Sequence, residues 1–215
     1  MKIKNTFLII TTISYITFAQ VDFRVGMGLD FFNSPSMTDY INQSNFSGGP
    51  DLSSFSTAIN FSGEVGVKVQ NNFQVAGDLA YQLYSYNSNV TLGRYDIKFN
   101  NIMPSLLAYY LIEGTGYNFK FGGGAGLRIV SVEQTLPASV NSDNFSSIGY
   151  GVLLRAQGNT LLGDRIYANI CLDLRYDLNG IPENEGRKLY NNVLKEDVNF
   201  NQIALGIKLG LYYKL

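Results

Sequence analysis

Long stretches of this chain place an apolar residue at every second position. In residues 21–31 the odd positions are apolar, from Val21 to Phe31, and the even positions hold polar residues or glycine. The same alternation runs through residues 165–178 and through the last thirteen residues, 203–215. Because successive side chains of a strand point to opposite faces, these segments predict strands with one apolar and one polar face.

Five further segments show a weaker form of the same pattern. They are residues 55–69, 73–86, 97–112, 117–132 and 145–157. The segment 97–112 is apolar on both faces and is interrupted by Pro104, so we assign it as a strand because of its neighbours. The sequence therefore predicts an all-β fold with eight strands.

The connections between these strands alternate between short and long. The short ones are residues 70–72, 113–116 and 158–164, and the longer ones are residues 32–54, 87–96, 133–144 and 179–199. Short turns at one end and long loops at the other are typical of an antiparallel up-and-down transmembrane β-barrel, with the turns on the periplasmic side.

The first residues read as a cleavable signal peptide. Lys2 and Lys4 precede a short apolar run over residues 7–16, and small residues lead to Ala19. We expect cleavage after Ala19, which gives a signal peptide over 1–19 and one outer-membrane barrel domain over 20–215. No cysteine follows the cut directly, so a lipoprotein is not expected.

Composition excludes several kinds of chemistry. The 215 residues include no histidine, so no mechanism with an imidazole base or a histidine-bound metal is available. Cys171 is the only cysteine, which removes intrachain disulfides and CxxC metal sites. Without Lys2 and Lys4, 14 basic residues face 17 acidic ones, a net charge near −3, and no basic stripe indicates nucleic acid. We predict no enzymatic activity, no cofactor and no metal.

Two kinds of barrel fit eight alternating strands. One turns its apolar face out into lipid, and the other is an exported, soluble, lipocalin-like carrier that turns its apolar face in around a ligand. The polar faces carry charges of both signs beside many glycines, as a crowded narrow lumen requires. The apolar faces stay free of charge for five to seven alternate positions, enough to cross a bilayer. Both observations favour lipid.

Tyrosines near the strand ends support the same choice, because aromatic residues gather at membrane interfaces. The tyrosines assigned to this girdle are Tyr81, Tyr84, Tyr86, Tyr95, Tyr109, Tyr110, Tyr117, Tyr176, Tyr212 and Tyr213.

The charged residues of the polar faces are predicted to form a network that pairs inside the lumen and holds it together. Its predicted members are Asp22, Arg24, Glu64, Lys68, Asp78, Lys120, Arg128, Arg155, Asp173, Arg175 and Lys208. Carboxylates four residues apart on one strand, such as Asp173 and Asp177, are about 13 Å apart and do not make a paired-acid site by themselves.

The overall pattern of the chain resembles that of a known protein family. A signal peptide, eight alternating strands and a final strand that runs to the last residue resemble the small outer-membrane β-barrel proteins of the OmpA/OmpX type. The terminal segment is similar to the signal by which the barrel assembly machinery recognises such strands, carried here by Leu209, Leu211, Tyr213 and Leu215. The resemblance implies a Gram-negative outer-membrane location, a closed and tilted barrel, and loops that face the exterior.

The expected function is a structural or surface-interaction role, exerted through the extracellular loops. Residues 32–54 are nearly uncharged and offer Tyr40, Ile41 and Phe46 for contact, whereas residues 179–199 are densely charged. The expected partners are outer-membrane lipid, the assembly machinery during insertion, and an extracellular partner of the loops. Two alternatives stay open: a narrow passive or gated channel, and the soluble carrier of an apolar ligand.

Overall fold

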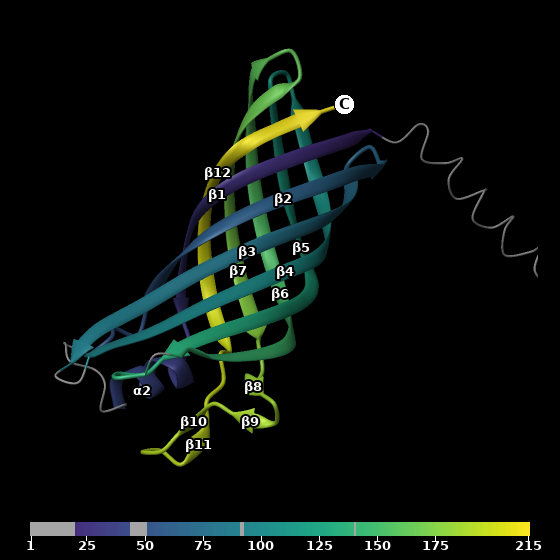
Figure 1. Ribbon diagram of the computed structural model, residues 1–215. Helices are drawn as coiled ribbons and strands as arrows, with labels where there is room; N and C mark the ends of the chain where they lie inside the picture. Colours follow the sequence, from purple (N-terminus) through teal and green to yellow (C-terminus); the bar gives the residue numbers. More distant parts are fainter. Residues whose placement is uncertain (1–19, 44–50, 91–92, 140) are drawn as a thin grey trace, which may run out of the picture.

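Eight long strands close into an antiparallel barrel in the part of the chain that the computed structural model describes, which is residues 20–43, 51–90, 93–139 and 141–215 (Figure 1). The predicted signal peptide and Phe46 lie outside the described residues. The eight strands are β1 (Val21–Asn33), β2 (Ser56–Gln70), β3 (Phe73–Val90), β4 (Gly93–Gly114), β5 (Tyr117–Thr135), β6 (Asp143–Gly163), β7 (Ile166–Leu178) and β12 (Gln202–Lys214). The predicted all-β, eight-stranded fold is confirmed.

Each long strand pairs with its neighbours along the chain, and the first and last strands close the ring. Met27 of β1 lies opposite Leu209 of β12 on one side and opposite Phe61 of β2 on the other. The uncertain segment around Pro104 is the central part of β4. The pairing with β5 is interrupted at Met103 and Pro104, because proline has no N–H to donate, and it resumes at Ser105 in the same register.

Several strands continue beyond the ends that the sequence predicted. The chain from 87 to 96, expected to be a loop, belongs largely to the β3–β4 hairpin, and β6 continues to Gly163. The turn after β6 is therefore Asp164 and Arg165 alone, rather than residues 158–164. Apolar alternation is required only where a strand faces lipid, so it ends before the backbone ladder does.

The longer loops carry short elements at one end of the barrel (Figure 1). A helix, α2 (Pro35–Gln43), follows β1, with proline at its first position, where its missing N–H costs no hydrogen bond. The chain between β7 and β12 forms four short strands: β8 (Glu183–Asn184), β9 (Arg187–Lys188), β10 (Tyr190–Asn191) and β11 (Glu196–Asp197). Within the described ranges, no helix is both long and apolar enough to cross a membrane.

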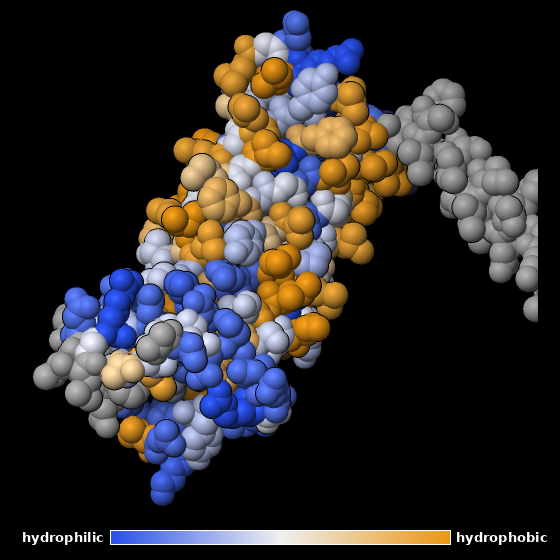
Figure 2. Space-filling model, viewed as in Figure 1, coloured by the Kyte–Doolittle hydropathy of each residue, from blue (hydrophilic) through white to orange (hydrophobic). Residues whose placement is uncertain are grey.

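The apolar face of the barrel points outward. The side chains of Val25, Ile170 and Leu209 are 62%, 55% and 63% exposed, whereas the neighbouring Arg24 is buried. In Figure 2 apolar residues cover much of the barrel wall, and hydrophilic residues gather at the end that carries α2 and β8–β11. This orientation is that of a barrel in lipid. It is opposite to the orientation of a soluble carrier with an apolar lining.

The predicted tyrosine girdle is wrong for five of its members, and two of these, Tyr84 and Tyr86, are half-buried against the apolar cluster at the α2 end of the barrel. Tyr95, Tyr109 and Tyr212 are buried inside the barrel, whereas Tyr110 and Tyr213, which follow two of them directly, are exposed on the outer wall. Adjacent strand residues face opposite sides, so a tyrosine near a strand end belongs to the girdle only when its parity points outward.

Glycine is required at a close approach of β1 to β12. A Cβ atom on Gly28 would collide with the carbonyl oxygen of Ile207, whereas a Cβ atom on Gly77 would meet no heavy atom within 4 Å. We expect Gly28→Ala to lower the free energy of unfolding by about 1–3 kcal/mol, because the backbones must separate. Gly77→Ala, the matched control, should change it by less than about 1 kcal/mol. Urea titration of both variants in lipid vesicles checks this, and equal stability would contradict it.

Candidate functional site

The barrel interior holds a balanced set of charges. In the described chain, the charged side chains that are buried comprise six carboxylates and six cations, so the formal charge of the lumen is zero. The carboxylates are Asp22, Asp30, Glu64, Asp78, Asp173 and Asp177, and the cations are Arg24, Lys120, Arg128, Arg155, Arg175 and Lys208. Buried charges are tolerated when they are paired and hydrogen-bonded, so this balance is a condition for folding.

Arg155 of β6 lies at the centre of the network. Its Nε atom donates to Asp173 Oδ1 at 2.6 Å, and its Nη1 atom lies 2.7 Å from Asp78 Oδ1 and 2.9 Å from Glu64 Oε2. These carboxylates come from β7, β3 and β2, so one guanidinium connects opposite walls of the barrel. Lys208 of β12 donates to the second oxygen of Asp173 at 2.6 Å.

Neutral side chains complete the hydrogen bonding of this central layer. Tyr109 donates its hydroxyl to Glu64 Oε2 at 2.6 Å, and Gln157 donates to both oxygens of Glu64. Arg24 donates to Asp78 and to the hydroxyl of Ser62, each at 3.1 Å. Tyr109, which was expected at the membrane interface, is therefore buried in the lumen, where its hydroxyl is hydrogen-bonded to Glu64.

A second layer lies toward the end of the barrel that carries the chain's C-terminus. Lys120 of β5 donates to both oxygens of Asp22 of β1 at 3.1 Å, and Tyr212 donates to Asp22 at 2.7 Å. At the rim beyond it, Glu113 of β4 accepts hydrogen bonds from Lys214, at 2.7 Å, and from Lys68. Strands β4 and β12 lie on opposite sides of the ring, so this ion pair spans the mouth.

A third layer lies on the other side of the central cluster. Arg175 donates to Asp30 at 2.7 Å, Asn60 donates to the same carboxylate oxygen at 2.6 Å, and Arg128 donates to Asp177 at 2.5 Å. Asp30 and Asp177 were missing from the predicted network. The alternation of side chains could have identified them. Asp30 lies on the polar face of residues 21–31, and Asp177 lies on the polar face of residues 165–178.

The structure places ten of the eleven predicted network residues inside the lumen. The exception is Lys68, which lies at the rim with a partly exposed side chain and pairs with Glu113. The residues of the predicted assembly signal point elsewhere: Leu209, Leu211 and Tyr213 lie on the outer wall of β12, and Leu215 follows that strand. Their role in assembly stays a prediction.

Above the third layer the interior becomes apolar. Phe99 of β4 stacks on Phe200 at a centroid distance of 5.2 Å, and Phe32 of β1 packs against the same group. Met37 and Ile41 of α2 are buried in this cluster, so the helix covers this end of the barrel interior. Ile41, predicted to be a contact residue of the loop surface, is part of the core because α2 turns its apolar face inward.

Polar contacts hold the cap in place, where the cap means α2 together with the short strands β8–β11 at the same end of the barrel. Gln134 of β5 donates to the hydroxyl groups of Tyr40, at 2.6 Å, and Tyr95, at 3.1 Å. Burial raises the pKa of Tyr40 above its ordinary value, so the hydroxyl, which is protonated at neutral pH in any case, stays protonated in more alkaline solution. In the β10–β11 segment, the side-chain oxygen of Asn191 accepts hydrogen bonds from the backbone N–H groups of Val193 and Leu194, which stabilise the turn between the two short strands.

The two ends of the barrel differ in charge. Among the side chains of the described residues, the end with α2 holds nine carboxylates and five cations, a net charge of −4, and the opposite end holds two carboxylates and three cations, a net charge of +1. The first set is Asp39, Asp51, Asp96, Glu133, Asp143, Glu183, Glu185, Glu196 and Asp197 with Arg94, Lys98, Arg187, Lys188 and Lys195; the second is Glu113 and Asp164 with Lys68, Arg165 and Lys214.

Comparisons with known proteins agree on the fold. No protein-family model matches the sequence, and no curated protein matches it. Among solved structures, the chain is similar to Neisserial surface protein A, with 15% identity, a TM-score of 0.51, and coverage of 91% of this chain and 97% of that one. It is also similar to Ail, the attachment invasion locus protein of Yersinia pestis, with 12% identity, coverage of 92% and 99%, and a TM-score of 0.49.

A major outer membrane protein of Thermus thermophilus matches in the same way, with 13% identity, coverage of 91% and 99%, and a TM-score of 0.49. The closed ring of eight antiparallel strands and the likeness to Neisserial surface protein A show that the fold of this chain is that of the small outer-membrane β-barrels, as the OmpA/OmpX-type pattern predicted. Together with the apolar outer wall, it is the fold of a protein of the outer membrane.

Proposed function

We propose that this protein, which has the fold of the small outer-membrane β-barrels, is a closed, non-enzymatic scaffold that presents a fixed surface to the cell exterior. The observation that carries the proposal is the filled interior. Ion pairs cross the lumen from the Glu113–Lys214 rim to the Arg175–Asp30 layer, and the apolar cap under α2 closes the remaining end. The barrel therefore serves as an anchor, and recognition belongs to the cap.

A filled lumen argues against a channel. An ion that crossed it would have to displace Arg155 from carboxylates of three strands and then pass between the stacked Phe99 and Phe200. Breaking a buried ion pair costs several kcal/mol, because a charge is left without a partner. An eight-stranded barrel is just wide enough for its own side chains, so no bypass is expected.

The exterior surface has features that suit recognition. The β10–β11 segment exposes Tyr190, Val193 and Leu194, and it is fastened through Asn191, whose side chain also donates to Gln43 of α2. Loops held on a rigid frame bind with a small loss of conformational entropy. The net charge of −4 at this end favours a partner with a cationic surface.

An enzymatic role finds no support among these residues. The chain has no histidine, and the buried carboxylates accept hydrogen bonds from lumen cations or from their neutral neighbours. These carboxylates are therefore engaged by donors of the lumen itself rather than directed at a substrate.

The proposal includes three kinds of partner. Outer-membrane lipid contacts the apolar wall, the barrel assembly machinery reads the last strand through Leu209, Leu211, Tyr213 and Leu215 during insertion, and an extracellular partner binds the cap. The outward position of these four side chains on or after β12 supports the second of them, because a strand presents one face to its surroundings along its whole length.

Planar-bilayer recording tests the closed scaffold. We expect the purified barrel to insert and to show no stable unitary conductance at neutral pH, because the lumen is blocked at every layer. Heat-modifiable gel migration of the same preparation provides the control, since it shows that a folded barrel is present. Stable unitary steps that disappear on Arg24→Ala or Arg175→Ala would replace this proposal with the narrow channel.

A further inference from the structure

Asp164 and Arg165 are neighbours in sequence with opposite charges, and neither takes part in an ion pair among the described residues. Twelve of the fourteen lysines and arginines within residues 20–215 have a carboxylate oxygen within 4.0 Å, and the exceptions are Arg165 and Lys195. Asp164, which precedes Arg165, takes part in no ion pair of the described chain either. One free cation and one free anion therefore share the β6–β7 turn.

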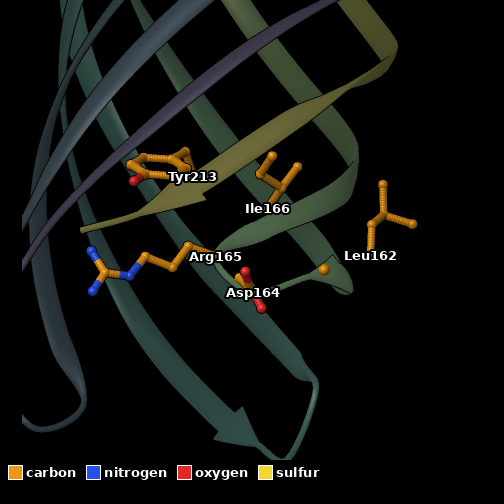
Figure 3. Close-up of a pocket in the computed structure, with 6 residues that line it drawn as sticks. Leu162, Asp164, Arg165, Ile166 and Tyr213 are labelled. Atoms are coloured by element: carbon orange, nitrogen blue, oxygen red, sulfur yellow. The ribbon is translucent and has the colours of Figure 1, made fainter.

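These two residues line a hollow on the outer surface. It has a volume of about 670 Å³, and its other walls are Leu162, Gly163, Ile166 and Tyr213. Figure 3 shows the Arg165 side chain extending beneath Tyr213, while Leu162 projects on the other side of the turn and Asp164 lies between them. The hollow thus combines separated opposite charges with exposed apolar side chains.

The hollow lies where the apolar wall meets the end of the barrel. It is at the end opposite to α2, next to the last residues of β12, which is the end with a net charge of +1. The backbone holds the turn in place, because Lys214 N donates to Arg165 O at 3.1 Å and Leu161 N donates to Gly116 O at 2.8 Å. In the proposed orientation, with the α2 end toward the cell exterior, this turn lies at the headgroup region of the inner leaflet.

We propose that this hollow binds the headgroup of a zwitterionic aminophospholipid of the inner leaflet. The Arg165 guanidinium binds the phosphate, for which its planar set of donors is well suited, and the Asp164 carboxylate accepts a hydrogen bond from the primary ammonium group. Tyr213 lies at the interface, and the acyl chains pack on Leu162 and Ile166. The inference rests on the outer-membrane location proposed above.

The charges select among lipids. A headgroup with a phosphate and no cation would meet the Asp164 carboxylate without compensation, which disfavours an anionic glycerol headgroup. A choline headgroup carries a positive charge but has no N–H to donate to that carboxylate. A primary ammonium group satisfies both conditions, so ethanolamine is the headgroup that this pair of residues favours.

Native mass spectrometry of the complete barrel in mixed micelles tests the proposal. The micelles contain phosphatidylethanolamine, phosphatidylglycerol or phosphatidylcholine as the only phospholipid. We expect the wild-type barrel to retain one phosphatidylethanolamine, and Arg165→Gln to lower its retention about tenfold, the effect of losing one charged hydrogen-bonding group. Lys195→Gln is the matched control, because it removes the other unpaired cation at the far end of the barrel.

Asp164→Asn tests the selectivity separately. It should keep the retention of phosphate-containing lipid but abolish the preference for phosphatidylethanolamine over phosphatidylglycerol. Equal retention by the wild type and Arg165→Gln would overturn the proposal, as would equal retention of the two lipids by the wild type. Heat-modifiable migration of each variant in vesicles separates two failures: a barrel that does not insert contradicts the proposed location, and a barrel that inserts without retaining lipid contradicts only the headgroup site.

Discussion

Replacing Arg155 by methionine is expected to lower the free energy of unfolding by about 3–5 kcal/mol, the cost of leaving buried charges without their partner. Arg155 contacts Glu64, Asp78 and Asp173 within 2.9 Å, and its side chain is buried. Methionine fills a similar volume but donates no hydrogen bond. Three carboxylates would then share the remaining cations, so their mutual repulsion adds to the loss.

Urea titration of the refolded barrel in lipid vesicles measures this change. Arg94→Met is the matched control, because Arg94 pairs with Asp96 at the exposed end of the barrel and should contribute less than about 1 kcal/mol. A double variant, Arg155→Met with Asp173→Asn, should be less destabilised than the single variant, since one of the unpaired charges is gone. If Arg155→Met and Arg94→Met were equally stable, the lumen network would not hold the barrel together.

Replacing Leu209 by arginine should prevent or strongly weaken insertion. Leu209 lies near the middle of β12 on the outer wall, where it is exposed in the isolated molecule. A charged side chain at the midplane of a bilayer destabilises a transmembrane barrel by about 2–4 kcal/mol. The same position is part of the predicted assembly signal, so the effect in cells should exceed the effect on refolding in vesicles.

Folding into vesicles, followed by heat-modifiable gel migration, measures the first effect, and the amount of barrel in the outer-membrane fraction measures the second. Leu194→Arg provides the control, because Leu194 is exposed in the chain between β10 and β11, outside the barrel wall. Wild-type stability of Leu209→Arg in vesicles would show that the outer wall does not face hydrocarbon, and it would remove the basis of the membrane assignment.

For the charge network, the sequence pattern predicts which side chains face inward but not which of them pair. Parity placed ten predicted residues on the inner face, because a strand alternates its side chains whatever its neighbours are. Parity did not identify the partners. Arg155 and Glu64 are 91 positions apart in the chain, and they meet because the tilt and register of the closed barrel bring β6 and β2 to opposite walls at one level.

The helix of the cap, in contrast, was not predicted from the sequence pattern. Residues 32–54 carry no strong pattern, and the sequence indicated a loop with Tyr40 and Ile41 free for contact. In the structure this segment contains α2, because an apolar cluster around Phe32 and Phe99 needs a cover once the strands leave the membrane. A nine-residue helix has little stability by itself, so only its tertiary contacts make it form.

Local alternation and composition were enough to predict the number of long strands, the apolar face of each, and the absence of histidine chemistry. The closed barrel was needed to show that Tyr109 binds a lumen carboxylate while Tyr110 faces outward, that six carboxylates and six cations balance within the described lumen, and that Asp164 and Arg165 remain unpaired beside Tyr213. The physical reason is that a strand's parity is fixed by its own residues, whereas contacts across a barrel depend on the register of all its strands.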